Sequence, residues 1–198
     1  MSKSAEVSAA APPPSRKVWI LFAIIALLSL GADQATKIWA RDALPVEPAG
    51  CEVPEAIAQG QCRGVVVSVI DGYWDWRLSM NHGSAFGLFS SQGGARIFLS
   101  VIGVLAVIGM LWLMHKSRED QRLLHWALAL VAGGAVGNLI DRIYFGVVTD
   151  FVLWRYHTKE WPVFNVADVV LVIGVGLMLI DTTREGRREK AQRAAAAA

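Results

Sequence analysis

Four stretches of the chain are apolar over nearly their whole length, and polar residues gather between them. A transmembrane helix needs roughly 20 apolar residues to cross about 30 Å of hydrocarbon, and each stretch approaches that length. The pattern therefore predicts an α-helical polytopic membrane protein with four transmembrane helices. The expected spans are Val18–Ala40, Ile97–Met114, Leu123–Ile140 and Trp161–Ile180.

The first apolar stretch has two interpretations. Arg16 and Lys17 precede a short uninterrupted apolar run, as in the h-region of a secretory signal peptide. However, no convincing small-x-small cleavage site follows, and the helical pattern continues as far as Trp39. We therefore expect an uncleaved first helix that carries Asp33 and Lys37 near its far end.

The polar segment between the first two apolar stretches contains two strand-like runs. Val65–Ile70 and Tyr73–Met80 flank the pair Asp71-Gly72, and this arrangement is the usual signal for a β-hairpin. We therefore expect an outer β-hairpin region over about residues 64–90.

The only two cysteines of the chain, Cys51 and Cys62, lie in this same polar segment. They can form one disulfide or remain two free thiols. A disulfide needs an oxidising compartment, so the outcome depends on the side of the membrane on which the segment lies.

The composition agrees with a membrane protein. Of the 198 residues, 54% are hydrophobic and only 18% are charged, and the mean hydropathy is +0.41. This balance is typical of a small polytopic membrane protein and unusual for a soluble domain. The formal net charge of +2 is too small to suggest a nucleic-acid partner.

Lysine and arginine are concentrated in both tails and in the connection between the second and third spans. In a four-helix topology these three regions share one side of the membrane, and the positive-inside rule makes that side cytoplasmic. We expect residues 1–17 to be a disordered cytoplasmic tail, 18–181 the membrane domain and 182–198 a basic, Ala-rich cytoplasmic tail. The hairpin region then faces outward. The basic residues are Lys3, Arg16, Lys17, Lys116, Arg118, Arg122, Arg184, Arg187, Arg188, Lys190 and Arg193.

Two aspartates, Asp141 and Asp168, lie in otherwise apolar runs. A charged side chain at membrane depth costs roughly 2.5–3.5 kcal/mol, so an intramembrane carboxylate indicates a functional site. An asparagine stands three residues before each of them, at Asn138 and Asn165. The third span runs outward and the fourth inward, so a rise of about 1.5 Å per residue puts both aspartates near the outer leaflet.

Such a pair of aspartates suits peptide hydrolysis. Two carboxyl groups in one site cannot both ionise easily, so the pair can hold a single proton. The ionised member can activate a water while the protonated member donates to a carbonyl oxygen. The four histidines lack the spacing of metal ligands, so we expect no metal and no cofactor. A structural alternative stays open, in which Asp141 pairs with Arg142 at the interface and Asp168 pairs with Arg142 or Lys37.

Five blocks of sequence, in order, give the chain a family resemblance. Over Val18–Asp181 it resembles the lipoprotein signal peptidases, the type II signal peptidases of bacteria. One block would be weak evidence, but five in the same order are strong. The blocks are DQATK (Asp33–Lys37), NHGSAF (Asn81–Phe86), GGAVGNLIDR (Gly133–Arg142), VVTDF (Val147–Phe151) and FNVAD (Phe164–Asp168).

The resemblance implies an aspartic endopeptidase of the bacterial inner membrane. Such an enzyme removes the signal peptide from diacylglyceryl-modified prolipoproteins, cutting just before the lipidated cysteine, and works near the extracytoplasmic face. By matching motif, Asp141 and Asp168 would be the catalytic dyad. Residues that would shape the site or hold the substrate are Asp33, Lys37, Asn81, Gly83, Asn138, Arg142 and Asn165.

The resemblance also implies a fold and a set of partners. The family has four membrane helices and a small extracytoplasmic β-cradle, to which Val147–Val152 would add a strand. The expected partners are lipid-modified prolipoproteins and membrane lipids, and the protein is expected to be a monomer. Glu47–Arg63, with its cysteines, departs from the family pattern as an insertion in the first outer loop.

Two other functions compete with the peptidase. Intramembrane carboxylates also serve as proton relays, so a small proton-coupled transporter is one alternative, and it predicts polar residues spread over the full membrane depth. A non-catalytic membrane scaffold is the other, and it predicts that Asp→Asn changes are tolerated.

Overall fold

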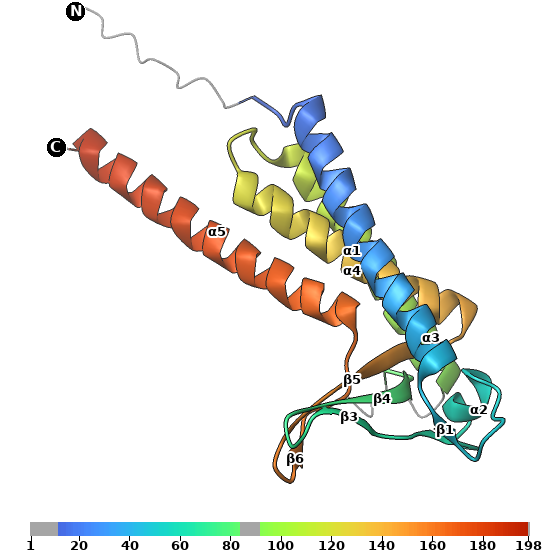
Figure 1. The fold of residues 1–198 in the computed structure, drawn as a ribbon. Helices are drawn as coiled ribbons and strands as arrows, with labels where there is room; N and C mark the ends of the chain where they lie inside the picture. Colours follow the sequence, from blue (N-terminus) through green and yellow to red (C-terminus); the bar gives the residue numbers. More distant parts are fainter. Residues whose placement is uncertain (1–11, 84–91, 198) are drawn as a thin grey trace, which may run out of the picture.

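The computed structural model describes residues 12–83 and 92–197, so part of the expected hairpin region, residues 84–90, lies outside it. Four long helices occupy most of the described chain, and each is long and apolar enough to cross a membrane (Figure 1). The predicted fold class is therefore confirmed. The helices are α1 (Arg16–Ala43), α3 (Gln92–Lys116), α4 (Arg122–Tyr144) and α5 (Val166–Ala197).

Helix α4 is the centre of the bundle. It packs against α1, α3 and α5, and most of its buried residues are small. Small residues let helix backbones approach closely, which is how helices associate where the surrounding lipid is as apolar as their side chains. A Cβ added to Gly133 would lie 2.7 Å from the carbonyl oxygen of Ala26 in α1. A Cβ on Gly134 would lie 2.8 Å from the carbonyl oxygen of Ala167 in α5.

A small sheet lies at one end of the bundle, away from the start of α1 and the end of α5 (Figure 1). It has four antiparallel strands in the order β3-β4-β5-β6. The expected hairpin forms from β3 and β4, and Gly72 in its turn adopts a φ of +76°, which glycine tolerates without strain. The expected strand near Val147–Val152 is present as β5. The strands are β3 (Val67–Ile70), β4 (Trp74–Asn81), β5 (Val148–Tyr156) and β6 (Lys159–Glu160).

The fourth helix begins at Val166 instead of the expected Trp161. The residues before it continue the sheet, because the N–H of Trp161 donates to the carbonyl of Trp154 (2.8 Å) and that of Phe164 to the carbonyl of Val152 (3.0 Å). Those bonds keep the segment extended beside β5. The first turn of α5 therefore lies next to β5.

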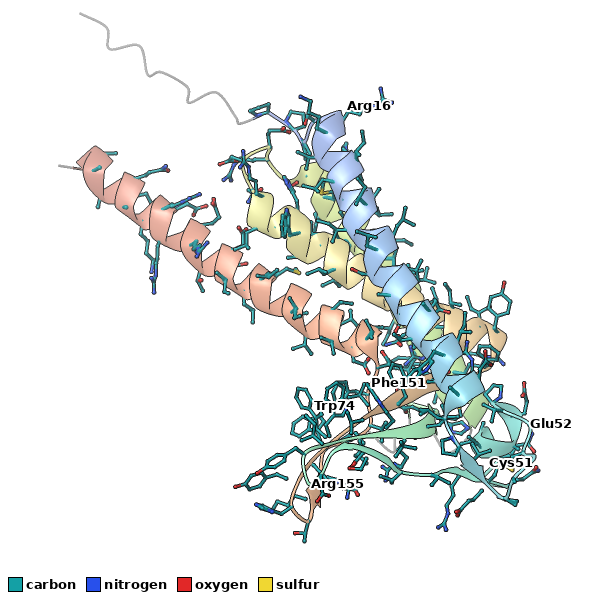
Figure 2. The ribbon with its side chains drawn as sticks, viewed as in Figure 1. Arg16, Cys51, Glu52, Trp74, Phe151 and Arg155 are labelled. Carbon is teal, nitrogen blue, oxygen red and sulfur yellow. A yellow bond between two sulfur atoms is a disulfide. The ribbon has the colours of Figure 1, made fainter. Side chains whose placement is uncertain are left out.

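An apolar cluster joins the sheet to the helices. It contains buried residues from the end of α1, from β4 and from the start of β5. Figure 2 shows Phe151 at this junction and Arg155 farther out along the same strand. The cluster fixes the first half of β5 against the ends of the helices. The buried members of the cluster are Ala40, Leu44, Leu78, Met80, Val147 and Phe151.

The inserted loop contains short elements of regular structure and a disulfide. Cys51 and Cys62 form a disulfide, which resolves the choice left open by the sequence. The loop also holds the strands β1 (Val46–Glu47) and β2 (Arg63–Gly64), which pair with each other, and the single-turn helix α2 (Glu55–Ala58). Side chains of α2 pack on the apolar cluster.

The structure describes part of each expected tail. Helix α5 continues through residue 182 as far as Ala197, so the basic tail is helical where it is described. Helix α1 begins at Arg16, and the residues just before it are hydrogen-bonded to the connection between α3 and α4 through Glu119. Residues 1–11 lie outside the described chain.

The close helix packing predicts opposite effects for two glycine replacements. Gly134→Ala should lower the free energy of unfolding by about 1–3 kcal/mol, because the added methyl group meets the backbone of α5. Gly109→Ala is the matched control, since its Cβ would meet nothing within 4 Å and alanine favours a helix by roughly 0.5–1 kcal/mol. Thermal unfolding in detergent measures both. Equal shifts of the unfolding temperature would contradict the packing described for α4.

Candidate active site

Buried polar side chains converge where α1, α4 and α5 meet the sheet. Most are removed from solvent almost completely, which is unusual for charged residues and requires that each finds a partner. They divide into two connected groups, one around Lys37 and one around Asp168. The buried members are Asp33, Lys37, Asn138, Asp141, Asp150 and Asn165.

The first group is built on the ammonium of Lys37 in α1, which has no exposed surface. Its Nζ lies 2.9 Å from Asp33 Oδ2 and 3.5 Å from Asp141 Oδ2. It also donates to Asn138 Oδ1 at 2.8 Å. A buried charge is tolerated only when it is paired and its hydrogen bonds are made, and these three partners meet that need.

The same group ties together four elements. Asp33 Oδ1 accepts the backbone N–H of Ala167 at the start of α5 (2.9 Å). Asp141 Oδ2 accepts the backbone N–H of Thr149 in β5 (2.8 Å), and Asp141 Oδ1 lies 3.7 Å from the guanidinium of Arg41. The two carboxylates therefore fix the positions of α5 and β5 relative to α1 and α4.

The second group surrounds Asp168, which is half-buried at the start of α5. Its Oδ1 accepts from the side-chain amide of Asn138 (3.0 Å) and its Oδ2 from the backbone N–H of Asn165 (3.3 Å). The backbone N–H of Asp168 donates in turn to Asn165 Oδ1 (3.0 Å). This reciprocal arrangement is a helix N-terminal cap, and it orients the carboxylate of Asp168.

Asp150 of β5 belongs to this second group. Its Oδ1 accepts from the side-chain amide of Asn165 (2.6 Å) and its Oδ2 from that of Asn81 in β4 (3.0 Å). Asn81 is held by Gly83, whose backbone N–H donates to Asn81 Oδ1 (2.7 Å) and whose φ is +75°. Asn165 therefore bridges the two aspartates, with its amide nitrogen on Asp150 and its amide oxygen on the backbone of Asp168.

The electrostatic environment of Asp150 favours a proton. Burial, and after it the neighbouring charge of Asp168, raise the pKa of Asp150 to about 7. Hydrogen bonds from Asn81 and Asn165 and the charge of Lys37 act in the opposite direction, without reversing the shift. Near neutral pH this carboxyl group is therefore protonated in a large fraction of molecules.

The sequence pairs Asp168 with Asp141, whereas the structure gives these two aspartates different surroundings. The polar partners of Asp141 are the cations Lys37 and Arg41 and the backbone of Thr149. The carboxylate that acts electrostatically on Asp150 is that of Asp168. The sequence left open an ion pair between Asp141 and Arg142. In the structure, the cations that lie near the Asp141 carboxylate are those of Lys37 and Arg41 instead.

Arg142, the remaining predicted site residue, lies beside the group around Asp168. Arg142 donates to the backbone carbonyl of Asn138 within its own helix (3.3 Å), and its charge lies near those of Asp168 and Asp150. Within the described ranges, no group of three or more histidine, cysteine, aspartate or glutamate side chains has an arrangement suited to a metal ion.

Sequence reasoning assigned no role to Asp150. A signal was available, because the block VVTDF contains an acid inside a β-branched, apolar run. Burying such a carboxyl group costs free energy unless it is hydrogen-bonded or paired, so its presence indicates a specific role. With Asp150 included, two aspartates on β5 and α5 are linked by hydrogen bonds through one shared asparagine, Asn165. Such a pair can take a proton from water and give one to a carbonyl oxygen.

Known proteins resemble this chain in sequence and in fold. The family model for signal peptidase (SPase) II matches residues 25–184. A lipoprotein signal peptidase of Xylella fastidiosa (strain 9a5c) is 36% identical over 170 residues, which cover 83% of this chain and 89% of that protein. One of Xanthomonas campestris pv. campestris (strain 8004) is 34% identical over 183 residues, covering 91% and 97%.

A solved structure agrees with these relatives. It is a bacterial membrane enzyme determined by the in meso method at 2.3 Å resolution, with a TM-score of 0.65 and 26% sequence identity. The match covers 89% of this chain and 94% of the other. The family resemblance seen in the sequence is thus confirmed, and this chain belongs to the signal peptidase II family of bacterial membrane peptidases.

Proposed function

We propose that this protein is an intramembrane aspartic endopeptidase with Asp150 and Asp168 as its catalytic pair. Its substrates are prolipoproteins that carry a diacylglyceryl-modified cysteine, and it cuts the signal peptide off just before that cysteine. The observation that carries the assignment of the pair is the raised pKa of Asp150 beside the carboxylate of Asp168, with Asn165 bonded to both.

The two aspartates have different tasks in this mechanism. Asp168 takes a proton from a water molecule, and the resulting hydroxide attacks the carbonyl carbon of the scissile bond. Asp150, protonated near neutral pH, donates its proton to the carbonyl oxygen and so prevents a full negative charge from developing there. When the tetrahedral intermediate collapses, Asp150 takes its proton back, and Asp168 gives its proton to the departing amine.

Asp141 acts as a positioning residue in this proposal. It accepts the N–H of Thr149, which immediately precedes Asp150, and it pairs with Lys37 and Arg41. Lys37 in turn donates to Asn138 Oδ1, so the amide nitrogen of Asn138 must point to Asp168. The buried cation therefore selects the amide orientation that supports the catalytic pair.

We place both termini in the cytoplasm and the site near the extracytoplasmic face of the bacterial inner membrane. The clusters of lysine and arginine lie at the helix ends away from the sheet, in accord with the positive-inside rule (Figure 1). The disulfide lies at the end with the sheet and suits an oxidising compartment. A lipid-anchored cysteine in the outer leaflet would bring the scissile bond to the same level, which confines the reaction to the interface. The proposed working unit is a monomer, in contact with membrane lipids and the prolipoprotein.

The transporter and scaffold alternatives are not favoured. The structure does have one further buried polar pair at the opposite end of the bundle, where Ser117 Oγ lies 2.9 Å from His125 Nε2. This pair has a structural role, because the Ser117 hydroxyl also donates to the carbonyl of Met114 at the end of α3. Membership of a peptidase family supports hydrolysis instead.

Conservative replacement of three aspartates separates the two possible catalytic pairs. Asp150→Asn and Asp168→Asn should each lower kcat by about 10²–10⁴-fold, because each removes a proton donor or acceptor. Asp141→Asn should keep measurable activity, since the amide oxygen can still accept the N–H of Thr149. Cleavage of a diacylglyceryl-modified prolipoprotein on a gel measures the rates, and thermal unfolding checks that each variant is folded. A folded, inactive Asp141→Asn enzyme beside an active Asp150→Asn enzyme would establish the Asp141–Asp168 pair instead.

The raised pKa of Asp150 predicts a loss of activity at alkaline pH. Because the folded-state pKa is about 7, well above the ordinary value of 3.8 for an aspartate, the proton stays bound through mildly acidic pH and leaves above about pH 7. The ratio kcat/KM should then fall by about tenfold per pH unit once the acid is fully ionised. Circular dichroism at each pH verifies that the protein stays folded. A flat profile between about pH 6 and 9 would rule out Asp150 as the acid.

The role given to Lys37 predicts a split between kinetic constants. Lys37→Met should lower kcat strongly and leave KM nearly unchanged, because the lysine acts on Asp168 through Asn138 and not on the substrate. It should also lower the unfolding temperature, since Asp33 and Asp141 lose their shared cation. Lys190→Met on the exposed part of α5 serves as control. An increased KM with normal kcat would show that Lys37 contacts the substrate directly.

A further inference from the structure

A large cavity lies at the end of the bundle away from the sheet, far from the aspartates. It has a volume of about 860 Å³ and is formed by the start of α1 and the start of α4. Figure 1 shows that these two helix ends lie at the same end of the molecule. Both helices begin their candidate membrane spans here, at Arg16 and Arg122, so the cavity is at the level where a bilayer has its head groups.

One wall of this cavity is held in place by hydrogen bonds. The backbone N–H of Glu119 donates to the carbonyl of Pro12 (3.1 Å). The hydroxyl of Ser15 donates to Glu119 Oε1 (2.7 Å), and the backbone N–H of Ser15 donates to the other carboxylate oxygen. The residues before α1 are therefore fixed to the connection between α3 and α4.

The cavity is lined by two cations and two anions. Among the residues that the structure describes, no carboxylate lies within ion-pair distance of the side chains of Lys17 and Arg122. Hydrogen bonds from Ser15 hold the pKa of Glu119 below its usual range, so it is ionised at neutral pH. Asp120, the second anion of the lining, accepts from Arg118 Nε through Oδ1 (3.2 Å).

The deeper wall is apolar. Leu21 of α1 and Trp126 of α4 each lie about one turn into their spans and line the cavity. Their exposed fractions are 41% and 51%, which leaves a surface for hydrocarbon rather than for a polar ligand. The tryptophan ring is suited to the membrane interface, where its N–H can stay near the head groups.

We propose that this cavity binds a phospholipid whose head group carries a primary ammonium next to its phosphate, as phosphatidylethanolamine does. The phosphate lies on Lys17 and Arg122, the ammonium lies on Asp120 and Glu119, and an acyl chain runs along Trp126. A phosphatidylglycerol head group would place no cation on the two carboxylates. A choline head group has a cation but no N–H donor for them. The mixed charge of the cavity therefore selects the zwitterion with N–H groups.

The test measures lipid affinity on the full-length protein. Native mass spectrometry of the purified protein compares phosphatidylethanolamine, phosphatidylcholine and phosphatidylglycerol with identical acyl chains. Phosphatidylethanolamine should bind tightest. The double variant Lys17→Gln/Arg122→Gln should weaken its binding by about tenfold or more, the order expected for two cations near a phosphate. Asp120→Asn should abolish the preference over the other two lipids and leave their own affinities nearly unchanged.

A control variant and two further outcomes complete the experiment. Lys116→Gln replaces an exposed cation at the same end of the bundle, at the end of α3, and should leave the affinity unchanged. Thermal unfolding and prolipoprotein cleavage in detergent should be unaltered in all variants, so this result is independent of the proposed catalytic pair. Equal affinity for the three lipids, or tightest binding of phosphatidylglycerol, would overturn the proposal. Undiminished phosphatidylethanolamine binding by the double variant would overturn it as well.

Discussion

The buried ammonium of Lys37 is the interaction on which the rest of the site depends. It lies between Asp33 and Asp141 and also donates to Asn138, so one side chain of α1 contacts residues on its own helix and on α4. The two carboxylates continue the connection to the backbones of Ala167 and Thr149. A buried cation that lost any of these partners would be costly, and this cost keeps four elements in one arrangement.

The small sheet has a chemical role as well as a structural one. Its strand β5 begins in the apolar cluster with the end of α1, and this placement carries Asp150 to the start of α5. The extended segment before α5 is bonded to the same strand through Phe164. Both proposed catalytic aspartates are thus positioned by β5, although one belongs to a strand and the other to a helix. A bundle of helices alone would supply only one of them.

The features that depend on local sequence could be predicted, and those that depend on tertiary contacts could not. The four helices and the hairpin follow from apolar length and from the Asp71-Gly72 turn. The importance of Asn138 and Asn165 followed from their spacing before two aspartates, and both prove to be buried and hydrogen-bonded. The proximity of Asp150 to Asp168 requires β5 to fold back against α5, and no periodicity in the sequence encodes that contact.

The central claim is that Asp150 holds a proton near neutral pH and is the acid of the proposed catalytic pair. Infrared difference spectroscopy of the protonated carboxyl C=O stretch, recorded during a pH titration, tests this claim directly. The account predicts a carboxylic acid band that disappears with a midpoint near pH 7, is absent from Asp150→Asn and persists in Asp141→Asn. A band that persists in Asp150→Asn and is lost in Asp141→Asn would contradict it.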